Sequence, residues 1–528
     1  MSLRHLKPLR VAVAALCLTV LTLAFLGAHL PHPLISLFAS LQFVPTLIAL
    51  ATGSLALGAI IILVVTLTAG RIYCSAICPL GILQDAIARI TSLFRRKPFF
   101  LRYAPAWTKV RHLFFWTTLL TIPLGGAGLA IAWLDPYSTF GRTVSLLIRP
   151  LIRFAHNAIV PHAEKAHVTG LYHLDIALAA LPLLLGVGAV FLLIVVMASL
   201  RGRLYCNTLC PVGTLLGFIA SRSWLRLKIN ADACGKCGEC LKSCKAQCID
   251  LKAGTVDASR CVSCYNCLAA CDQGAMRLAT NWTVSRTTKP SDATQPPDSG
   301  RRQFLLTATG GALVTGATLL PDISRADDHE KKHGDGHGKK RKYKNVVTPP
   351  IAGDTDTFLA HCTACQLCIS SCTTGVLQPA FLQYGPQHLL KPRMDYSKAF
   401  CNYTCHRCTE ICPTGAIPFL PVPQKQITRI GMAHFNKENC IVSVYHTDCG
   451  ACSEHCPTKA VHMVPYEGGL VIPEVDKSLC IGCGACEFAC PADDKAILVH
   501  GAPKEKLARR PSEEKPTAPT VNKDGFPF

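Results

Sequence analysis

The sequence predicts an integral membrane α-helical bundle joined to two small, cysteine-rich α+β domains. Three observations predict this fold class. Half of the 528 residues are hydrophobic and only 16% are charged, which is too apolar for an ordinary soluble domain. Twenty-four of the 30 cysteines fall into six groups of four. An arginine pair in the middle of the chain precedes a mildly apolar stretch.

Four uncharged runs before residue 201 are long enough to cross a bilayer, which needs about 20 residues. The predicted spans are Val11–Leu30, Leu47–Leu67, Leu113–Trp133 and Ile176–Leu200. We therefore expect a four-span membrane domain over residues 1–229. Lys and Arg residues before the first span and after the second and fourth place those segments in the cytoplasm. The segment 31–46 has no charged residue and is expected to be an outer loop.

The cysteine groups predict iron–sulfur clusters, because three thiolates on one tight loop plus a fourth downstream hold a 4Fe–4S cubane. Two groups lie in a predicted domain over residues 230–282: Cys234, Cys237, Cys240, Cys244 and Cys261, Cys264, Cys267, Cys271. Four lie in a predicted domain over residues 351–502: Cys362, Cys365, Cys368, Cys372; Cys401, Cys405, Cys408, Cys412; Cys440, Cys449, Cys452, Cys456; and Cys480, Cys483, Cys486, Cys490. The sequence thus predicts six 4Fe–4S clusters on ferredoxin-like domains, and electron transfer as their task.

Two other uses of cysteine fit the pattern less well. Structural zinc prefers separated C-x2-C pairs, and disulfide frameworks are typical of small secreted domains. The fourth cysteine of a ferredoxin motif usually binds the other cluster. We therefore expect one cluster on Cys234, Cys237, Cys240 and Cys271, and another on Cys261, Cys264, Cys267 and Cys244. For the four C-terminal groups the spacing leaves the partners ambiguous.

The arginine pair indicates a second targeting signal. Arg301 and Arg302, followed by the apolar stretch Leu305–Leu320, resemble a twin-arginine export signal. We expect residues 301–326 to form a fifth span, so that the four-cluster domain lies outside the cytoplasm. Three flanking segments are predicted to be unstructured on composition: a linker at 283–300, a basic His- and Lys-rich tether at 327–350 and a tail at 503–528.

An internal repeat marks a further candidate redox element. Gly70-Arg71-Ile72-Tyr73-Cys74-x3-Cys78-Pro79-x-Gly81 recurs as Gly202-Arg203-Leu204-Tyr205-Cys206-x3-Cys210-Pro211-x-Gly213. A C-x3-C spacing places two sulfurs on one face of a helical turn, and we expect both pairs at the cytoplasmic membrane surface. Three roles stay open: Cys74, Cys78, Cys206 and Cys210 could bind an additional metal centre, act as redox-active thiols, or stand at helix starts, where Pro79 and Pro211 fit the first turn.

These motifs resemble two known families. Residues 1–275 resemble the NapH family of membrane quinol dehydrogenases, and residues 299–500 resemble the NapG and MauM family of exported four-cluster ferredoxins. The resemblance implies a multi-pass protein of the bacterial inner membrane that serves as the quinol dehydrogenase module of a respiratory complex. Electrons would pass from the quinone pool through the clusters to a periplasmic redox protein, such as a cytochrome c or a molybdoenzyme, as in nitrate respiration. The twin-arginine export machinery would be a further partner.

Two alternative functions remain. Electrons could flow in reverse, from a periplasmic dehydrogenase to quinone. The chain could also act in maturing a periplasmic metalloenzyme, as related NosR-type and CcoG-type proteins are implicated in doing. For quinol chemistry we expect a proton acceptor near the membrane surface, and Asp135 is the candidate, although Asp-Pro also commonly starts a turn. The net charge of +21 does not indicate nucleic-acid binding, because the clusters are negatively charged and the basic residues flank predicted spans.

Overall fold

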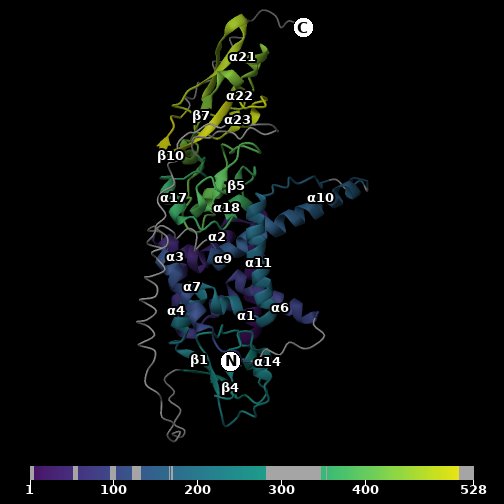
Figure 1. The fold of residues 1–528 in the computed structure, drawn as a ribbon, viewed down its shortest axis with the longest axis vertical. Coiled ribbons are helices and arrows are strands. Elements are labelled where there is room, and N and C mark those ends of the chain that lie inside the picture. The colour runs from purple at the N-terminus through teal and green to yellow at the C-terminus, as the bar shows by residue number, and fades with distance from the viewer. Residues whose placement is uncertain are drawn as a thin grey trace, which may run out of the picture. The chain divides into compact units, whose positions relative to one another are not determined.

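A computed structural model of the chain describes residues 5–51, 57–94, 103–121, 133–165, 167, 170–280, 346–351 and 354–510 (Figure 1). The chain divides into two compact units, one of residues 1–282 with 342–528 and one of residues 283–341. The predicted linker and twin-arginine segment lie outside the described residues, as do most of the tether and the tail and parts of the second and third predicted spans. The described residues therefore do not test the predictions made for these segments.

The described residues up to 220 are mostly helical. The elements are α1 (Leu6–Leu26), α2 (His32–Ser40), α3 (Phe43–Ala51), α4 (Leu57–Ala69), α5 (Ile72–Ala76), α6 (Pro79–Leu93), α7 (Thr108–Thr121), α9 (Pro136–Arg142), the π-helix η3 (Thr143–Ile148), α10 (Arg149–Lys165), α11 (Leu181–Arg201), α12 (Leu204–Thr208) and α13 (Pro211–Ala220). In Figure 1 these purple to blue helices gather into one helical region.

Two helices of this region are long and apolar enough to cross a membrane. They are α1 and α11, which coincide with the first and fourth predicted spans. Helices α2 and α3 would count as a third span only as a pair bent by 88°, and a bundle of four or five spans stays a prediction. The segment 31–46, expected as an outer loop, is mostly helical, with Pro33 in the first turn of α2, and its side of the membrane stays a prediction.

The two long helices end at glycines against which other domains pack. Gly27 ends α1 in the left-handed conformation (φ 85°), and a Cβ there would lie 2.6 Å from the Ser370 carbonyl oxygen. Gly202 ends α11 with φ 64°, and a Cβ there would lie 2.7 Å from the Lys245 carbonyl oxygen. Only glycine tolerates both the backbone conformation and the approach. The C-terminal end of each long helix therefore contacts a different cysteine-rich domain.

The first cysteine-rich domain follows directly after the helices. It contains β1 (Leu225–Ile229), α14 (Glu239–Ser243), β2 (Ile249–Asp250), β3 (Thr255–Val256), α15 (Asn266–Ala269) and β4 (Met276–Thr280). β1 pairs antiparallel with β4, and β2 pairs with β3. The β1–β4 ladder joins the beginning of the domain to its end, with Leu225 opposite Thr280. The core inside is small and consists largely of cysteines.

The second cysteine-rich domain has two halves, of which the second repeats this plan of two antiparallel strand pairs and the first has one pair. Its first half contains α17 (Thr355–His361), α18 (Leu367–Ser370), β5 (Leu377–Pro379), η5 (Pro386–His388), β6 (Pro392–Met394), α19 (Arg407–Glu410) and α20 (Val422–Lys425). Its second half contains β7 (Thr428–Phe435), η6 (Lys437–Asn439), α21 (Ile441–Tyr445), α22 (Ala451–Glu454), β8 (Val461–Pro465), η7 (Glu467–Gly469), β9 (Val471–Val475), α23 (Ala485–Ala489) and β10 (Ile497–Leu507). Each sheet is a two-stranded antiparallel pair: β5–β6, β7–β10 and β8–β9.

The first half of this second domain shares a core with the helices. Leu367 and Ile411 belong to the same buried cluster as Phe25 of α1. Polar contacts reinforce the junction, since the Ser145 and Ser370 hydroxyls lie 2.7 Å apart. Helix α18, which carries Cys368, is thus fixed to the helical region by buried contacts rather than by a tether alone.

Candidate metal centres

The cysteines of the first domain interleave across their two motifs. Cys234, Cys237 and Cys240 line a pocket of about 350 Å³ together with Cys271, the last cysteine of the other motif. Cys267 faces Cys264, Cys261 and Cys244, and their charges act on one another. These are the two groupings expected from the spacing, and each places four thiols around one space.

The C-terminal cysteines interleave in the same way, which the spacing alone left ambiguous. One pocket of about 350 Å³ is lined by Cys440, Cys449, Cys452 and Cys490. The electrostatic interactions between neighbouring thiols indicate the other three sets. These are Cys362, Cys365, Cys368 with Cys412; Cys401, Cys405, Cys408 with Cys372; and Cys480, Cys483, Cys486 with Cys456. In every set the fourth cysteine comes from the neighbouring motif.

The loops that carry these cysteines have a backbone suited to an anion. The residues on both sides of the second cysteine of a motif have positive φ in four motifs: Lys236 and Gly238, Ser263 and Tyr265, Ala364 and Gln366, Gly482 and Gly484. Left-handed residues in turns direct successive backbone N–H groups toward one point and form an anion-binding nest. Five of the eight are not glycine, so the conformation is strained, as is common in loops that bind a ligand. A negatively charged iron–sulfur cluster fits this backbone.

Cys248, which belongs to no motif, supports one ligand set. Its Sγ lies 3.6 Å from that of Cys244. The hydrogen bond that the Cys248 thiol donates lowers the pKa of Cys244 to about 6, because the bond stabilises the thiolate. Metal binding requires the thiolate form, so Cys248 favours the state of Cys244 that binds iron.

The interleaving makes a specific prediction for a single ligand variant. Cys271→Ser should remove the cluster of Cys234, Cys237 and Cys240, although all three are intact, and leave the cluster on Cys264 assembled. We expect purified protein to lose about four irons per chain, because a cubane needs its fourth thiolate. Iron quantification measures the loss. Cys244→Ser should remove the other cluster instead, and loss of iron from both sets in either variant would contradict the pairing.

The two Cys-x3-Cys-Pro repeats come together in the helical region. Cys74 lies in α5 and Cys206 in α12, while Cys78 and Cys210 are the residues immediately before α6 and α13. Pro79 and Pro211 occupy the first turns, as the sequence predicts. All four cysteines are buried in one core, and charge on Cys206, Cys74 and Cys210 acts on Cys78. They are enclosed by protein, and their expected place at the cytoplasmic membrane surface stays a prediction.

The arginines of the repeats cross over to the opposite repeat. Arg71 donates to the Cys206 carbonyl oxygen at 3.3 Å, and Arg203 donates to that of Cys74. A Cβ at Gly81 would lie 2.6 Å from the Arg203 guanidinium, and one at Gly213 would lie 2.9 Å from that of Arg71. The repeated Gly, Arg and Cys therefore form one centre with approximate twofold symmetry, which explains why all of them recur.

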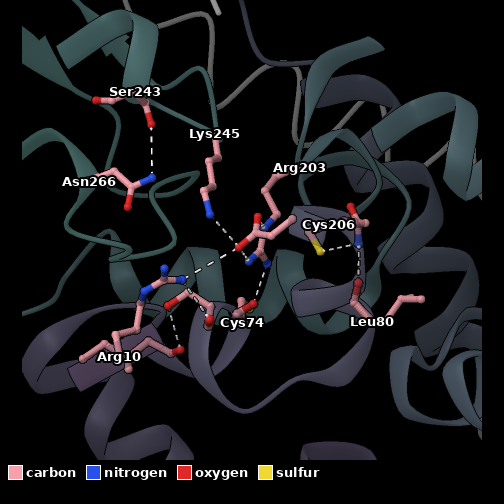
Figure 2. Close-up of polar contacts among 12 residues, drawn as sticks. Arg10, Cys74, Leu80, Arg203, Cys206, Ser243, Lys245 and Asn266 are labelled. Carbon is pink, nitrogen blue, oxygen red and sulfur yellow. Dashed lines mark hydrogen bonds and ion pairs between the residues drawn. The ribbon is translucent and has the colours of Figure 1, made fainter. Parts of the chain in front are cut away.

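One carboxylate joins this centre to the first cysteine-rich domain. Asp85 receives two hydrogen bonds from Arg203, both 2.7 Å. Lys245, which directly follows the cluster ligand Cys244, places its Nζ 3.0 Å from the same carboxylate, and Arg10 lies 3.8 Å away (Figure 2). Three cations share one anion here. The excess positive charge lies beside buried cysteines and suits a negatively charged occupant.

Asp135 is buried and caps a helix. Its carboxylate precedes α9 and accepts hydrogen bonds from the Ser138 N–H at 2.9 Å and the Ser138 hydroxyl at 2.6 Å. Asp-Pro, expected to start a turn, here starts α9. Asp135 also lies near Tyr73 and Tyr205, which follow the two motif arginines, and Tyr137 lies near Cys365. This carboxylate therefore stands between the central cysteines and the nearest C-terminal cluster set.

Several residues near these centres belong to no cysteine motif and to no repeat. Arg10 lies in α1, and Gln84 and Asp85 are neighbours in α6, where Gln84 donates to Cys206 Sγ at 3.1 Å. Lys391 is buried near Cys362; burial lowers the pKa of this lysine, while the negative charge available on Cys362 raises it. For Arg10, Gln84 and Asp85, no motif or spacing in the sequence marked a place beside the central cysteines.

A site for a single metal ion differs in geometry from a site for an iron–sulfur cluster. Within the part of the chain that the structure describes, no three His, Cys, Asp or Glu side chains are placed around one ion. A cubane bonds each thiolate to a different iron, so its ligands surround a larger space.

Comparison with known proteins agrees with this distribution of cysteines. A family model described as "4Fe-4S binding domain" matches residues 51–98 and 183–231, the segments that carry the two Cys-x3-Cys-Pro repeats. A model described as "4Fe-4S dicluster domain" matches residues 447–493. No solved structure matches the chain.

The curated relatives are ferredoxin-type proteins. Ferredoxin-type protein NapF of Escherichia coli is 30% identical over 154 residues, which is 29% of this chain and 85% of NapF. Methylamine utilization ferredoxin-type protein MauM of Methylorubrum extorquens is 27% identical over 39% of this chain and 90% of its own length. Ferredoxin-type protein NapH of Escherichia coli is 25% identical over 45% of this chain and 74% of its own length. The chain combines sequence similar to each of them.

Proposed function

Because this chain belongs to the ferredoxin-type protein family of NapF and its Nap and Mau relatives, we propose that it oxidises quinol at a membrane and passes the electrons along 4Fe–4S clusters to a periplasmic redox protein. Oxidation of one quinol to quinone releases two electrons and two protons. Each cluster takes one electron at a time, and the clusters carry the redox step while the protein sets their positions.

The observation that best supports this proposal is the order in which the four C-terminal cysteine sets lie in space. The set of Cys365 lies against the helices, since a Cβ at Gly141 would meet the Cys365 carbonyl oxygen at 2.4 Å. The set of Cys401 is next, and the Cys401 N–H donates to the Cys483 carbonyl oxygen at 2.9 Å. The set of Cys483 in turn adjoins that of Cys452. Four sets thus form one row that starts at the helical region.

The contacts of the long helices support a placement of the two cysteine-rich domains on opposite sides of the membrane. Helix α1 has Arg10 near Asp85 and Lys245 at one end and Gly27 against Ser370 at the other. A helix of 21 residues is about 31 Å long, close to the thickness of a bilayer core. We therefore propose that the first domain is cytoplasmic and that the row of four sets is periplasmic, which requires export by the twin-arginine segment.

The central cysteines would join the two sides. We assign Cys74, Cys78, Cys206 and Cys210 a further iron–sulfur centre with two thiolates from each repeat. Thiolate ligands suit iron–sulfur clusters, and two buried arginines, Arg71 and Arg203, supply positive charge at this place. Such a centre would link the cytoplasmic pair of clusters to the periplasmic row, with Asp135 positioned beside the route as a proton acceptor for quinol.

The test is anaerobic reduction by quinol. The full-length protein in nanodiscs receives a menaquinol or ubiquinol analogue, and low-temperature EPR follows cluster reduction. We expect Asp135→Asn to slow this reduction about 100-fold, as loss of a general base does, because the amide takes no proton, while its single oxygen can still accept the two hydrogen bonds from Ser138. Ser138→Ala removes one of those hydrogen bonds but keeps the carboxylate, so it serves as the matched control.

Other outcomes would favour the alternatives. Clusters that dithionite reduces but neither quinol does would remove quinol as the donor. Reduction of quinone by protein whose clusters are already reduced would then support reverse flow. Accumulation of a cofactor-deficient periplasmic acceptor in a deletion strain would instead support the maturation role.

A further inference from the structure

The two cysteine sets nearest the helices each have an enclosed lysine beside them. Lys391 is 0% exposed and Lys425 is 3% exposed. Lysine is almost never so completely buried unless its charge is paired, because removing an ammonium group from water is costly. Two such residues in one small domain therefore require a partner for each charge.

Neutral groups bind the first ammonium. Lys391 Nζ donates to the Leu359 carbonyl oxygen and lies 2.8 Å from His388 Nδ1. Its nearest source of negative charge is the thiol of Cys362, a member of the set nearest the helices. No carboxylate of the described residues lies within ion-pair distance of this nitrogen.

The second ammonium has the same surroundings. Lys425 Nζ donates to the carbonyl oxygens of Asn402 and Tyr403, the latter at 3.3 Å. It also hydrogen-bonds to Cys401, a member of the second set in the row. The described part of the chain again supplies no carboxylate within ion-pair distance. In both places the missing counter-charge is at the site of a cluster.

We propose that Lys391 and Lys425 are the counter-ions of the first two clusters of the row, and that they raise the reduction potentials of these clusters above those of the outer two. Reduction adds a negative charge, which a buried cation stabilises strongly where water does not screen it. This inference rests on the proposed function and deepens it, because the first acceptor of electrons from quinol needs a higher potential than a low-potential ferredoxin.

The cations beside the outer two sets are more exposed to solvent. Arg429 donates to the Cys480 carbonyl oxygen at 3.1 Å, and Lys495 donates to that of Cys490. Both side chains are partly exposed, so solvent screens their charge. In the third set, the buried residue Glu487 directly follows Cys486 in the sequence. The charge pattern therefore separates the inner pair of clusters from the outer pair.

Redox titration of the holoprotein tests this inference without quinol. Mediators set the potential, and EPR gives the midpoint of each transition. We expect Lys391→Gln and Lys425→Gln each to lower one of the two highest midpoints by about 59 mV, which corresponds to a tenfold lower equilibrium constant for a one-electron couple. Glutamine keeps a hydrogen-bond donor but removes the charge, so a role in hydrogen bonding alone would leave the midpoint unchanged.

Lys398→Gln is the matched control, because this exposed lysine lies three residues before Cys401 and is screened by water. It should leave all midpoints at their original values. Unchanged midpoints in both buried-lysine variants, with iron content equal to wild type, would overturn the inference. If a Gln variant assembles no cluster, Lys391→Arg and Lys425→Arg keep the charge, and retention of the high midpoints in either would support it while low midpoints would count against it. Failure of quinol reduction alone would leave these shifts in place and would affect only the proposed function.

Discussion

Arg203→Ala is expected to unfold the helical region or prevent its assembly, with a loss of about 3–5 kcal/mol, the usual cost of removing one partner of a buried ion pair. The Arg203 side chain is completely enclosed and binds both oxygens of Asp85 at 2.7 Å. It also donates to the Cys74 carbonyl oxygen, so the variant would leave a buried carboxylate and a buried carbonyl oxygen without this partner. Proteins have a total stability of about 5–15 kcal/mol, so the loss is a large part of it.

Thermal unfolding of the protein in nanodiscs, followed by circular dichroism, measures this effect. Arg203→Lys should recover only part of the stability, because an ammonium group cannot bind two carboxylate oxygens and the carbonyl in the same planar geometry. Lys242→Ala is the control. Its ion pair with Glu239 is 2.5 Å long, but both side chains are about half exposed, and such pairs contribute about 0–1 kcal/mol. An Arg203→Ala protein that melts like wild type would show that the crossed arginines do not hold the repeats together.

The sequence predicts the cysteine groups well because their information is local. Three ligands within seven residues, as in Cys234–Cys240, define a loop whatever its surroundings. The partner of a fourth cysteine is a matter of tertiary structure: Cys412 and Cys372 exchange places between neighbouring motifs, and no spacing rule distinguishes this from other pairings of four groups. The structure supplies that choice, and with it the order of the row.

Hydropathy was informative for α1 and α11, whose apolar runs are unbroken, but it did not predict the helices within residues 31–46. A segment without charge between two apolar runs has no local feature that separates a loop from a bent helical pair. The crossed contacts of Arg71 and Arg203 were equally inaccessible. The repeat shows that both arginines recur, but only the close approach of the two copies shows that each binds the other's backbone.

Cys365→Ser is expected to abolish reduction of the outer clusters by quinol. This thiol belongs to the set that adjoins the helices, so every electron that enters the row there must pass the cluster it helps to bind. A serine oxygen is a poor ligand for iron in a cubane, and the cluster should be lost or become too unstable to carry electrons. EPR of the nanodisc protein should show outer clusters that dithionite still reduces but that quinol no longer does.

Cys490→Ser is the matched control, because it removes one thiolate ligand from the cluster at the far end of the row. Both variants should lose about four irons, so iron content and general damage are matched between them. Only the position of the missing cluster differs. In Cys490→Ser, quinol should still reduce the inner three clusters at the normal rate. If quinol reduced the outer clusters of Cys365→Ser as fast as those of wild type, electrons would have to enter the row beyond its first cluster, and the helical region would not be their source.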